Sequence, residues 1–123
     1  MKNNEELWYL ATPYWDDNSA VREARFKKVN EIAWKLAGEG IFTFSPVSMS
    51  HPIHEAVYTN EQLDREQQHW FFMHWDRLFF DKCVGIILCD GYLDSRGCME
   101  ELAWFTERGK PVRHVRDLLD ETS

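Results

Sequence analysis

The chain has 123 residues, a length typical of one domain, and we expect residues 1–123 to form one. Its 44% hydrophobic and 28% charged residues are typical of a globular protein. The formal net charge is −7 and no run of Lys and Arg occurs, which argues against binding to a nucleic acid polymer or an anionic membrane surface. A single nucleotide stays possible, because one local pocket can carry a charge opposite to that of the whole protein.

Strand-like and helix-like patterns alternate along the chain, without internal repeats. Short apolar runs predict buried strands, and longer runs with a period of 3.6 residues predict helices. In chain order, we predict a strand at residues 7–12, a helix from Asn18 or Ser19 to Gly38, a strand at 41–44, a polar loop at 47–60, a helix at 61–80, a strand at 84–88, a turn-rich loop at 91–97, a helix at 98–108 and a strand at 111–115.

This alternation implies right-handed βαβ crossovers, and therefore an α/β fold in which helices cover both faces of a parallel sheet. Four strands are visible, and a fifth is possible within residues 46–60. Ligands of such sheets bind beyond the carboxyl ends of the strands. In this chain those ends carry residues 12–14, 45–51 and 89–97.

The expected compartment follows from the lack of targeting and membrane-spanning patterns in the sequence. The opening residues are polar and acidic, and every apolar stretch is too short to span a bilayer. Cys83, Cys89 and Cys98 are expected to be buried thiols. We therefore expect a cytoplasmic protein with no membrane partner.

Several familiar motifs are missing. No dinucleotide fingerprint follows the first strand, and no P-loop occurs. His51 and His54 are spaced to approach one another, but no cysteines at metal-finger spacing accompany them. Ser45, Ser48 and Ser50 lack the G-x-S-x-G context of a hydrolase nucleophile. We expect neither a metal nor an organic cofactor, and we expect the loop histidines to bind substrate or cap a turn.

Glu101 stands in unusual surroundings for a carboxylate. On a helical wheel of residues 98–108 it lies at the edge of the apolar arc, whereas Glu100 and Glu107 lie nearly opposite that arc and should face water. It also lies near the start of the helix, whose positive end favours an anion. This position suits a partly desolvated, oriented nucleophile. The alternative is a boundary glutamate that forms a salt bridge.

Asp76 is surrounded by large apolar side chains along its predicted helix. These neighbours, three and four residues away, are Phe72, Met73, Phe79 and Phe80. Loss of hydration there would raise the pKa of Asp76 and suit it to proton donation. The alternative is that Arg77 or a backbone amide satisfies it. Two carboxylates in different environments are the usual arrangement for cleavage of a glycosidic bond.

Three segments are distinctive in combination: YLATP at residues 9–13, SPVSMSHPI at 45–53 and GYLDSRGCMEE at 91–101. Together they resemble the nucleoside 2-deoxyribosyltransferase-like superfamily, most closely its DUF1937 branch, over nearly the whole chain. The most specific part is the S-x-G-x-x-x-E element that runs from Ser95 to Glu101. The resemblance implies a flavodoxin-like or Rossmann-like three-layer sandwich with a four- to five-stranded parallel sheet.

The resemblance also implies a covalent glycosyl-enzyme intermediate on Glu101, with Asp76 as acid and base, Tyr9 hydrogen-bonded near the nucleophile, and no cofactor. The segments at the strand ends supply the candidate substrate-binding residues, which are Pro13, Ser48, Ser50, His51, Asp94, Ser95, Arg96 and Gly97.

The leading hypothesis is an N-glycosidic-bond hydrolase or transferase acting on a nucleoside or a nucleoside 5′-monophosphate. In the superfamily, nucleoside transferases resemble D-x-G-x-x-x-E and monophosphate hydrolases resemble S-x-G-x-x-x-E, so Ser95 favours the monophosphate. The physical reason is that a second carboxylate would repel a phosphate, whereas a hydroxyl and backbone amides can donate to one. Arg96 would add positive charge, although the S-x-R element of those hydrolases is replaced here by residues 13–15. In the alternative, Ser95 only caps the helix.

Two other function classes stay open. One is a non-catalytic nucleotide-binding or sensing module on the same fold, and the other is a structural interaction protein that uses the aromatic helix. Residues 70–80 are apolar all round that helix, more than one face against a sheet can bury. We therefore predict a homodimer or a higher homo-oligomer with this helix in the interface.

Overall fold

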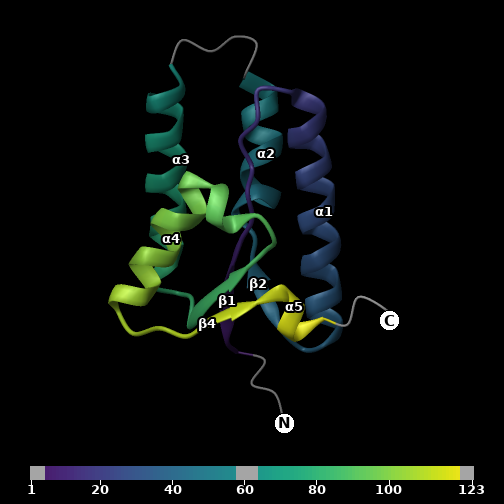
Figure 1. Cartoon of the computed structure of the whole chain (residues 1–123), viewed down its shortest axis with the longest axis vertical. Helices are drawn as coiled ribbons and strands as arrows, with labels where there is room; N and C mark the ends of the chain where they lie inside the picture. Colours follow the sequence, from purple (N-terminus) through teal and green to yellow (C-terminus); the bar gives the residue numbers. More distant parts are fainter. Residues whose placement is uncertain (1–4, 58–63, 120–123) are drawn as a thin grey trace.

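The computed structural model describes residues 5–57 and 64–119. Strands and helices alternate through them, except that two helices follow the second strand (Figure 1). The elements are β1 (Leu7–Ala11), α1 (Ser19–Gly38), β2 (Phe42–Phe44), α2 (Pro46–Val57), α3 (Arg65–Phe80), β3 (Gly85–Leu88), the short 3₁₀ helix η2 (Tyr92–Asp94), α4 (Arg96–Glu107), β4 (Val112–His114) and α5 (Val115–Leu118).

The four strands form one parallel sheet in the order β2-β1-β3-β4. Tyr9, in the middle of β1, pairs with Phe44 on one side and Ile86 on the other. This is the flavodoxin-like strand order, in which the chain first moves outward from β1 and then returns across it to β3. The α/β fold with a four-stranded parallel sheet is therefore confirmed, and β1 and β3 flank the point where the strand order reverses.

Helices cover both faces of the sheet, because alternate side chains of β1 and β3 point to opposite sides. On one face, Tyr9 and Ile86 pack with Phe80 of α3 and Phe105 of α4. On the other face, the buried residues come from β1, α1, α2, β3 and the position after β3, and are Leu10, Val29, Leu36, Val47, Ile87 and Cys89. Figure 1 shows α3 and α4 on one side of the sheet and α1 on the other, which gives the expected three layers.

Residues 46–57 are helical, so the prediction of a polar loop there, with a possible fifth strand, is wrong within the described residues. Pro46 occupies the first helical position, where a missing N–H is harmless. Pro52 lies inside the helix and removes one backbone hydrogen bond. The buried face consists of Val47, Ser50, His51 and His54, which have perfect helical spacing but are mostly polar. Residues 58–60 lie outside the described part.

The helix starts differ from the prediction where a side chain caps them. Asp64 caps α3 and forms a reciprocal capping box with Gln67, and the predicted start at residue 61 lies outside the described residues. Ser95 caps α4 by accepting a hydrogen bond from the backbone N–H of Cys98, so this helix begins at Arg96, two residues before the prediction. The last strand is shorter than predicted because Val115 begins α5.

The chain after β1 continues in an extended path before it turns back into α1 (Figure 1). Tyr14 attaches this path to α2, because its hydroxyl lies 2.8 Å from Nδ1 of His51 and 3.3 Å from Nδ1 of His54. Gly91, after β3, has a φ of +87° and approaches the same path: a Cβ on it would lie 3.3 Å from Cγ of Pro13. The loops that follow the two central strands are thus held together above the sheet.

The described residues include no helix that is long and apolar enough to cross a membrane.

Candidate active site

A cavity of about 750 Å³ lies at the carboxyl ends of β1 and β3. Its walls include residues 12–15 after β1, residues 89–91 after β3, and side chains from each of the five α-helices. The cavity therefore occupies the place where the strand order reverses, which is where open α/β sheets bind their ligands. Its volume lies within the range of about 300–1,000 Å³ that small-molecule sites have.

Glu101 lines this cavity and is only 5% exposed. The hydroxyl of Tyr9, fully buried on β1, donates a hydrogen bond to Oε2 of Glu101 on α4. No Lys, Arg or His in the described ranges forms an ion pair with Glu101, so it is not the boundary glutamate of a salt bridge. Glu100, its neighbour, faces the other way and meets Arg96 at 3.0 Å and His69 at 3.2 Å.

Asp76 is the second carboxyl group in the cavity wall and is 6% exposed. Arg77 does not satisfy it, because the Arg77 guanidinium points to Glu100, 3.9 Å away. The Oδ1 atom of Asp76 is buried and has no hydrogen-bond partner among the described residues. An unpartnered buried oxygen is costly, which makes it a contact point for a ligand that can supply the missing hydrogen bond.

Burial changes the protonation of both carboxyl groups. It raises the pKa of Asp76 to about 7, and the nearby Tyr9 hydroxyl opposes that rise only in part. Burial also raises the pKa of Glu101, which the negative charge of Asp76 raises further and the Tyr9 hydrogen bond lowers. Since two anions this close are unfavourable, the pair retains a proton near neutral pH. The hydrogen bond that Tyr9 donates to Glu101 favours the anionic form of Glu101.

This pair has the properties that acid–base chemistry on a bound ligand needs. A carboxyl group with a pKa near 7 can donate and accept a proton at neutral pH. A carboxylate held by one hydrogen bond and otherwise desolvated can attack an electrophilic carbon. The geometry thus brings together the three residues predicted as catalytic, Glu101, Asp76 and Tyr9.

Six of the eight predicted substrate-binding residues line the cavity. They are Pro13, Ser50, Asp94, Ser95, Arg96 and Gly97. Ser48 and His51 do not line it. Ser48 contacts Asn30 and Ser45, and Nε2 of His51 lies 2.6 Å from Oε2 of Glu23. These two residues fasten α2 to α1, whereas His54, the other histidine of α2, does reach the cavity wall.

Two of the predicted substrate-binding residues in the wall, Ser95 and Arg96, already have protein partners. Ser95 caps α4 through Cys98, although its own hydroxyl proton is still available for a further hydrogen bond. Arg96 forms ion pairs with Glu66, at 2.5 Å, and with Glu100. Arg96 therefore contributes little uncompensated positive charge to the cavity.

The sequence patterns did not identify the part of the wall that α1 supplies. Arg25, Lys28, Ile32 and Lys35 all line the cavity. Their spacing of three, four and three residues places them on one face of a helix, and this periodicity was available in the sequence. Trp15 and Phe72 add aromatic surface to the wall. No group of three or more potential metal ligands gathers within residues 5–57 and 64–119.

Comparison with known proteins places the chain in one family. No curated protein matches it. The model of the family described as "Domain of unknown function (DUF1937)" matches residues 6–116, which include both central strands and all three residues of the Tyr9–Glu101–Asp76 cluster. The chain belongs to the DUF1937 family.

Proposed function

We propose that the protein cleaves the N-glycosidic bond of a nucleoside or a nucleoside 5′-monophosphate through a covalent intermediate on Glu101. One observation carries this proposal: a carboxylate oriented by Tyr9 lies in the same cavity wall as a buried carboxyl group whose pKa is about 7. The resemblance of the segments at residues 9–13, 45–53 and 91–101 to the nucleoside 2-deoxyribosyltransferase-like superfamily supports the same chemistry.

In the first step, an oxygen of Glu101 forms a bond to C1′ of the sugar as the bond from C1′ to the base nitrogen breaks. The base leaves with the electron pair of that bond, and Asp76 transfers its proton to the departing base. Tyr9 keeps the carboxylate of Glu101 oriented toward the sugar. The products of this step are a glycosyl ester of Glu101 and the free base.

In the second step, water or a second base attacks C1′, and the ester bond to Glu101 breaks. Asp76, now ionised, accepts the proton that the attacking molecule loses, so both residues return to their starting states. Water gives a hydrolase and a second base gives a transferase. The chain's own residues supply every group that these steps require, so we propose no metal or organic cofactor.

Incubation with a panel of nucleosides and 5′-monophosphates, followed by chromatography of the free base, tests this proposal. We expect base release by the wild type and none by Glu101→Gln. Mass spectrometry of the protein quenched during turnover should show a mass increase equal to one sugar or sugar phosphate less one water. Ligand-dependent thermal stabilisation without any base release would instead identify a nucleotide-binding or sensing module.

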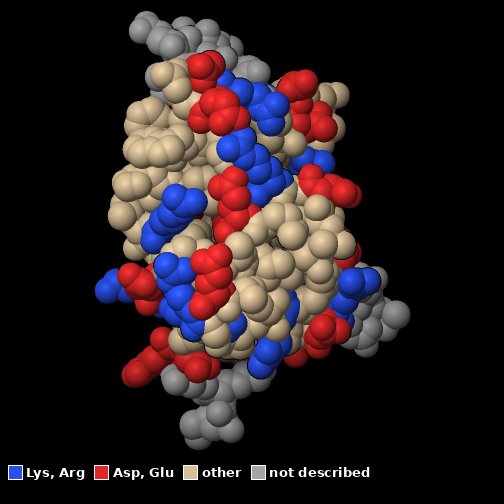
Figure 2. All heavy atoms as spheres, turned by 60° about the vertical axis from the view of Figure 1, so that its left-hand side comes forward, with Lys and Arg blue, Asp and Glu red and all other residues tan. Residues whose placement is uncertain are grey.

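We further propose that two or more copies associate through α3. Its outward residues are large, apolar and exposed, and they are Trp70, Phe71, Trp75 and Leu78. Figure 2 shows a broad uncharged patch on this side of the molecule. The three cysteines are buried and none forms a disulfide, and we propose the reducing cytoplasm as the compartment.

A further inference from the structure

One helix face supplies a row of cations to the cavity. Arg25 and Lys28 lie one turn apart on α1, on the face that also presents Ile32 and Lys35 to the cavity. The global charge of −7 would repel an anionic ligand, so any anion must be bound by a local excess of positive charge. Such an excess requires cations in the cavity wall whose charge is not neutralised by nearby carboxylates.

In this respect Arg25 and Lys28 differ from two other cations of the cavity wall, Arg96 and Arg116. Arg96 is paired with Glu66 and Glu100, and Arg116 lies 3.5 Å from Asp90. In contrast, no carboxylate of the described residues lies within ion-pair distance of Arg25 or Lys28. Arg25 donates a hydrogen bond to the backbone carbonyl of Trp15, at 2.8 Å, which holds the guanidinium and leaves its charge unneutralised.

Arg25 and the first turn of α4 line the same cavity. Its charge acts on Cys98, where it opposes the rise in pKa that burial gives to that thiol. Cys98 follows Ser95 and Gly97, two further residues of the cavity wall. The guanidinium therefore shares the cavity with a helix start, where backbone N–H groups and the helix dipole also favour an anion.

We propose that Arg25 and Lys28 form a phosphate-binding subsite, and that the substrate is therefore a nucleoside 5′-monophosphate rather than a free nucleoside. This inference rests on the proposed function for the identity of the remaining ligand. The fixed guanidinium offers two donors in one plane, and the Lys28 ammonium adds a mobile charge, a combination that suits the oxygens of a phosphate dianion. Asp76 does not repel that dianion in its protonated form, which predominates below its pKa of about 7.

Binding is measured by calorimetry on the Glu101→Gln variant, so that turnover does not interfere. The probes are adenosine, guanosine, cytidine and thymidine, their 5′-monophosphates, and ribose 5-phosphate. We expect each monophosphate that binds to bind more tightly than its nucleoside, and ribose 5-phosphate to bind without a base. Arg25→Gln and Lys28→Gln should each reduce this preference, by about tenfold for Arg25, while the affinity for the nucleoside stays unchanged.

Lys27→Gln is the matched control, because Lys27 is exposed on the same helix and does not line the cavity. Its substitution changes the net charge by the same amount as Lys28→Gln. An equal loss of the preference for the monophosphate in Lys27→Gln and Lys28→Gln would overturn the proposal. An unchanged preference in Arg25→Gln would also overturn it. If Arg25→Gln fails to fold, Arg25→Lys and the comparison of Lys28→Gln with Lys27→Gln test the subsite instead. The proposal then requires Arg25→Lys to retain most of the preference for the monophosphate.

The two proposals can fail separately. If the wild type releases base from free nucleosides and Arg25→Gln does not alter its discrimination between nucleoside and monophosphate, the phosphate subsite is wrong and the enzyme assignment stands. If monophosphates bind in an Arg25-dependent way but the wild type releases no base, the subsite stands and the enzyme assignment is wrong.

Discussion

Tyr9 and Glu101 are separated by 92 positions in the sequence, and the hydroxyl of the first donates a hydrogen bond to the carboxylate of the second. The bond joins the central strand β1 to α4 at the floor of the cavity. Because Tyr9 is fully buried, water does not compete for this bond. The orientation of Glu101 is therefore determined by the sheet and not by the solvent.

Glu101→Gln should abolish base release, whereas Glu100→Gln should leave most of the activity. Both variants remove one negative charge from the same turn of α4, but only Glu101 faces the cavity. Glu100 forms partly exposed ion pairs with Arg96 and His69, whose loss costs about 1 kcal/mol of stability or less. Initial rates of base release, measured at saturating substrate, distinguish the two. Equal losses of activity would remove the basis for assigning the nucleophile.

Tyr9→Phe should move the pH dependence of kcat/KM toward higher pH. The hydrogen bond from Tyr9 lowers the pKa of Glu101, so its removal raises that pKa further and the reactive anion forms only at higher pH. The rising limb of the pH profile of kcat/KM should shift accordingly. A uniform drop in rate at all pH values would leave the pKa of that limb unchanged. An unshifted profile would show that Tyr9 does not control the ionisation of Glu101.

Asp76→Asn should stabilise the folded protein above neutral pH. The pKa of Asp76 is about 7 when folded and about 4 when unfolded, so its contribution to stability is complete below pH 4 and is lost as pH rises toward 7. Wild-type stability should fall by about 1.4 kcal/mol per pH unit from this group within that window. Urea unfolding at pH 5 and pH 8 measures the difference, which should be smaller in Asp76→Asn. Asp81→Asn, an exposed position after the same helix, serves as the control and should show the wild-type pH dependence.

Gly97→Ala should fold normally and yet lose activity. A Cβ at Gly97 would meet only Sδ of Met73, at 3.9 Å, so the packing has room for it, but the methyl group would narrow the cavity beside Ser95. Gly85→Ala, in contrast, should destabilise the fold, because its Cβ would lie 2.5 Å from the carbonyl oxygen of Pro111 and from the Trp8 ring. Thermal melting and base release, measured on both variants, separate the two effects. Wild-type activity in Gly97→Ala would show that the substrate does not approach this turn.

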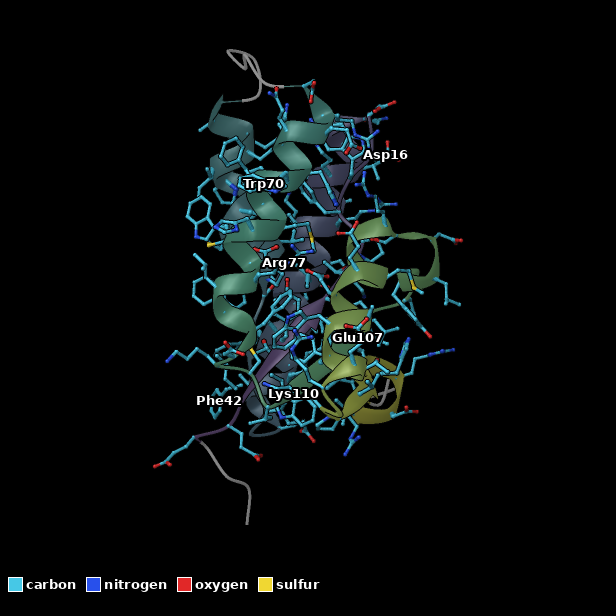
Figure 3. All side chains as sticks on the ribbon, turned by 90° about the vertical axis from the view of Figure 1, so that its left-hand side faces the viewer. Asp16, Phe42, Trp70, Arg77, Glu107 and Lys110 are labelled. Atoms are coloured by element: carbon cyan, nitrogen blue, oxygen red, sulfur yellow. The ribbon has the colours of Figure 1, made fainter. Side chains whose placement is uncertain are left out.

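The protein should be a dimer or higher oligomer at micromolar concentration, with α3 in the interface. Figure 3 shows Trp70 and Arg77 on this helix, with α4 beside it. Light scattering should give at least twice the chain mass of 14.7 kDa. Trp70→Glu combined with Leu78→Glu should produce the monomer, because a charge in an apolar interface is costly to bury.

Trp34→Glu provides the control for this experiment. Trp34 is 79% exposed on α1, so it tests whether any exposed tryptophan drives association. A monomeric wild type, or equal dissociation by the α1 variant, would contradict the proposed interface.

Much of the fold could be predicted because hydrophobic periodicity records it directly. The strands of residues 84–88 and 7–12 are short apolar runs, and their burial between two helical layers follows from that pattern. The helix α2 could not be found in this way. Its buried face includes the polar residues Ser50, His51 and His54, and the two histidines form hydrogen bonds with partners from other parts of the chain.

The candidate site was predictable in the same uneven way. Asp76 and Glu101 stood out because each is a carboxylate on an apolar helix face, and both are buried in the structure. The position of Arg25 and Lys28 in the cavity wall was hidden, because a cation on a long amphipathic helix has the same local pattern whether it faces solvent or a cavity. A cation that faces solvent can be distinguished from one that faces the cavity only when the path of the chain after β1, and with it the position of α1, is known.

The ring of Tyr9 lies between three others, with centroids 5.0 Å from Phe80, 5.6 Å from Phe105 and 5.8 Å from Phe44. These rings belong to the hydrophobic core and do not line the cavity, yet they determine where the tyrosine hydroxyl points. A substitution such as Phe80→Leu would leave every polar group of the site unchanged and still give the phenol room to tilt. A genetic screen for loss of function should therefore recover substitutions at these core phenylalanines, far from any atom that touches the substrate.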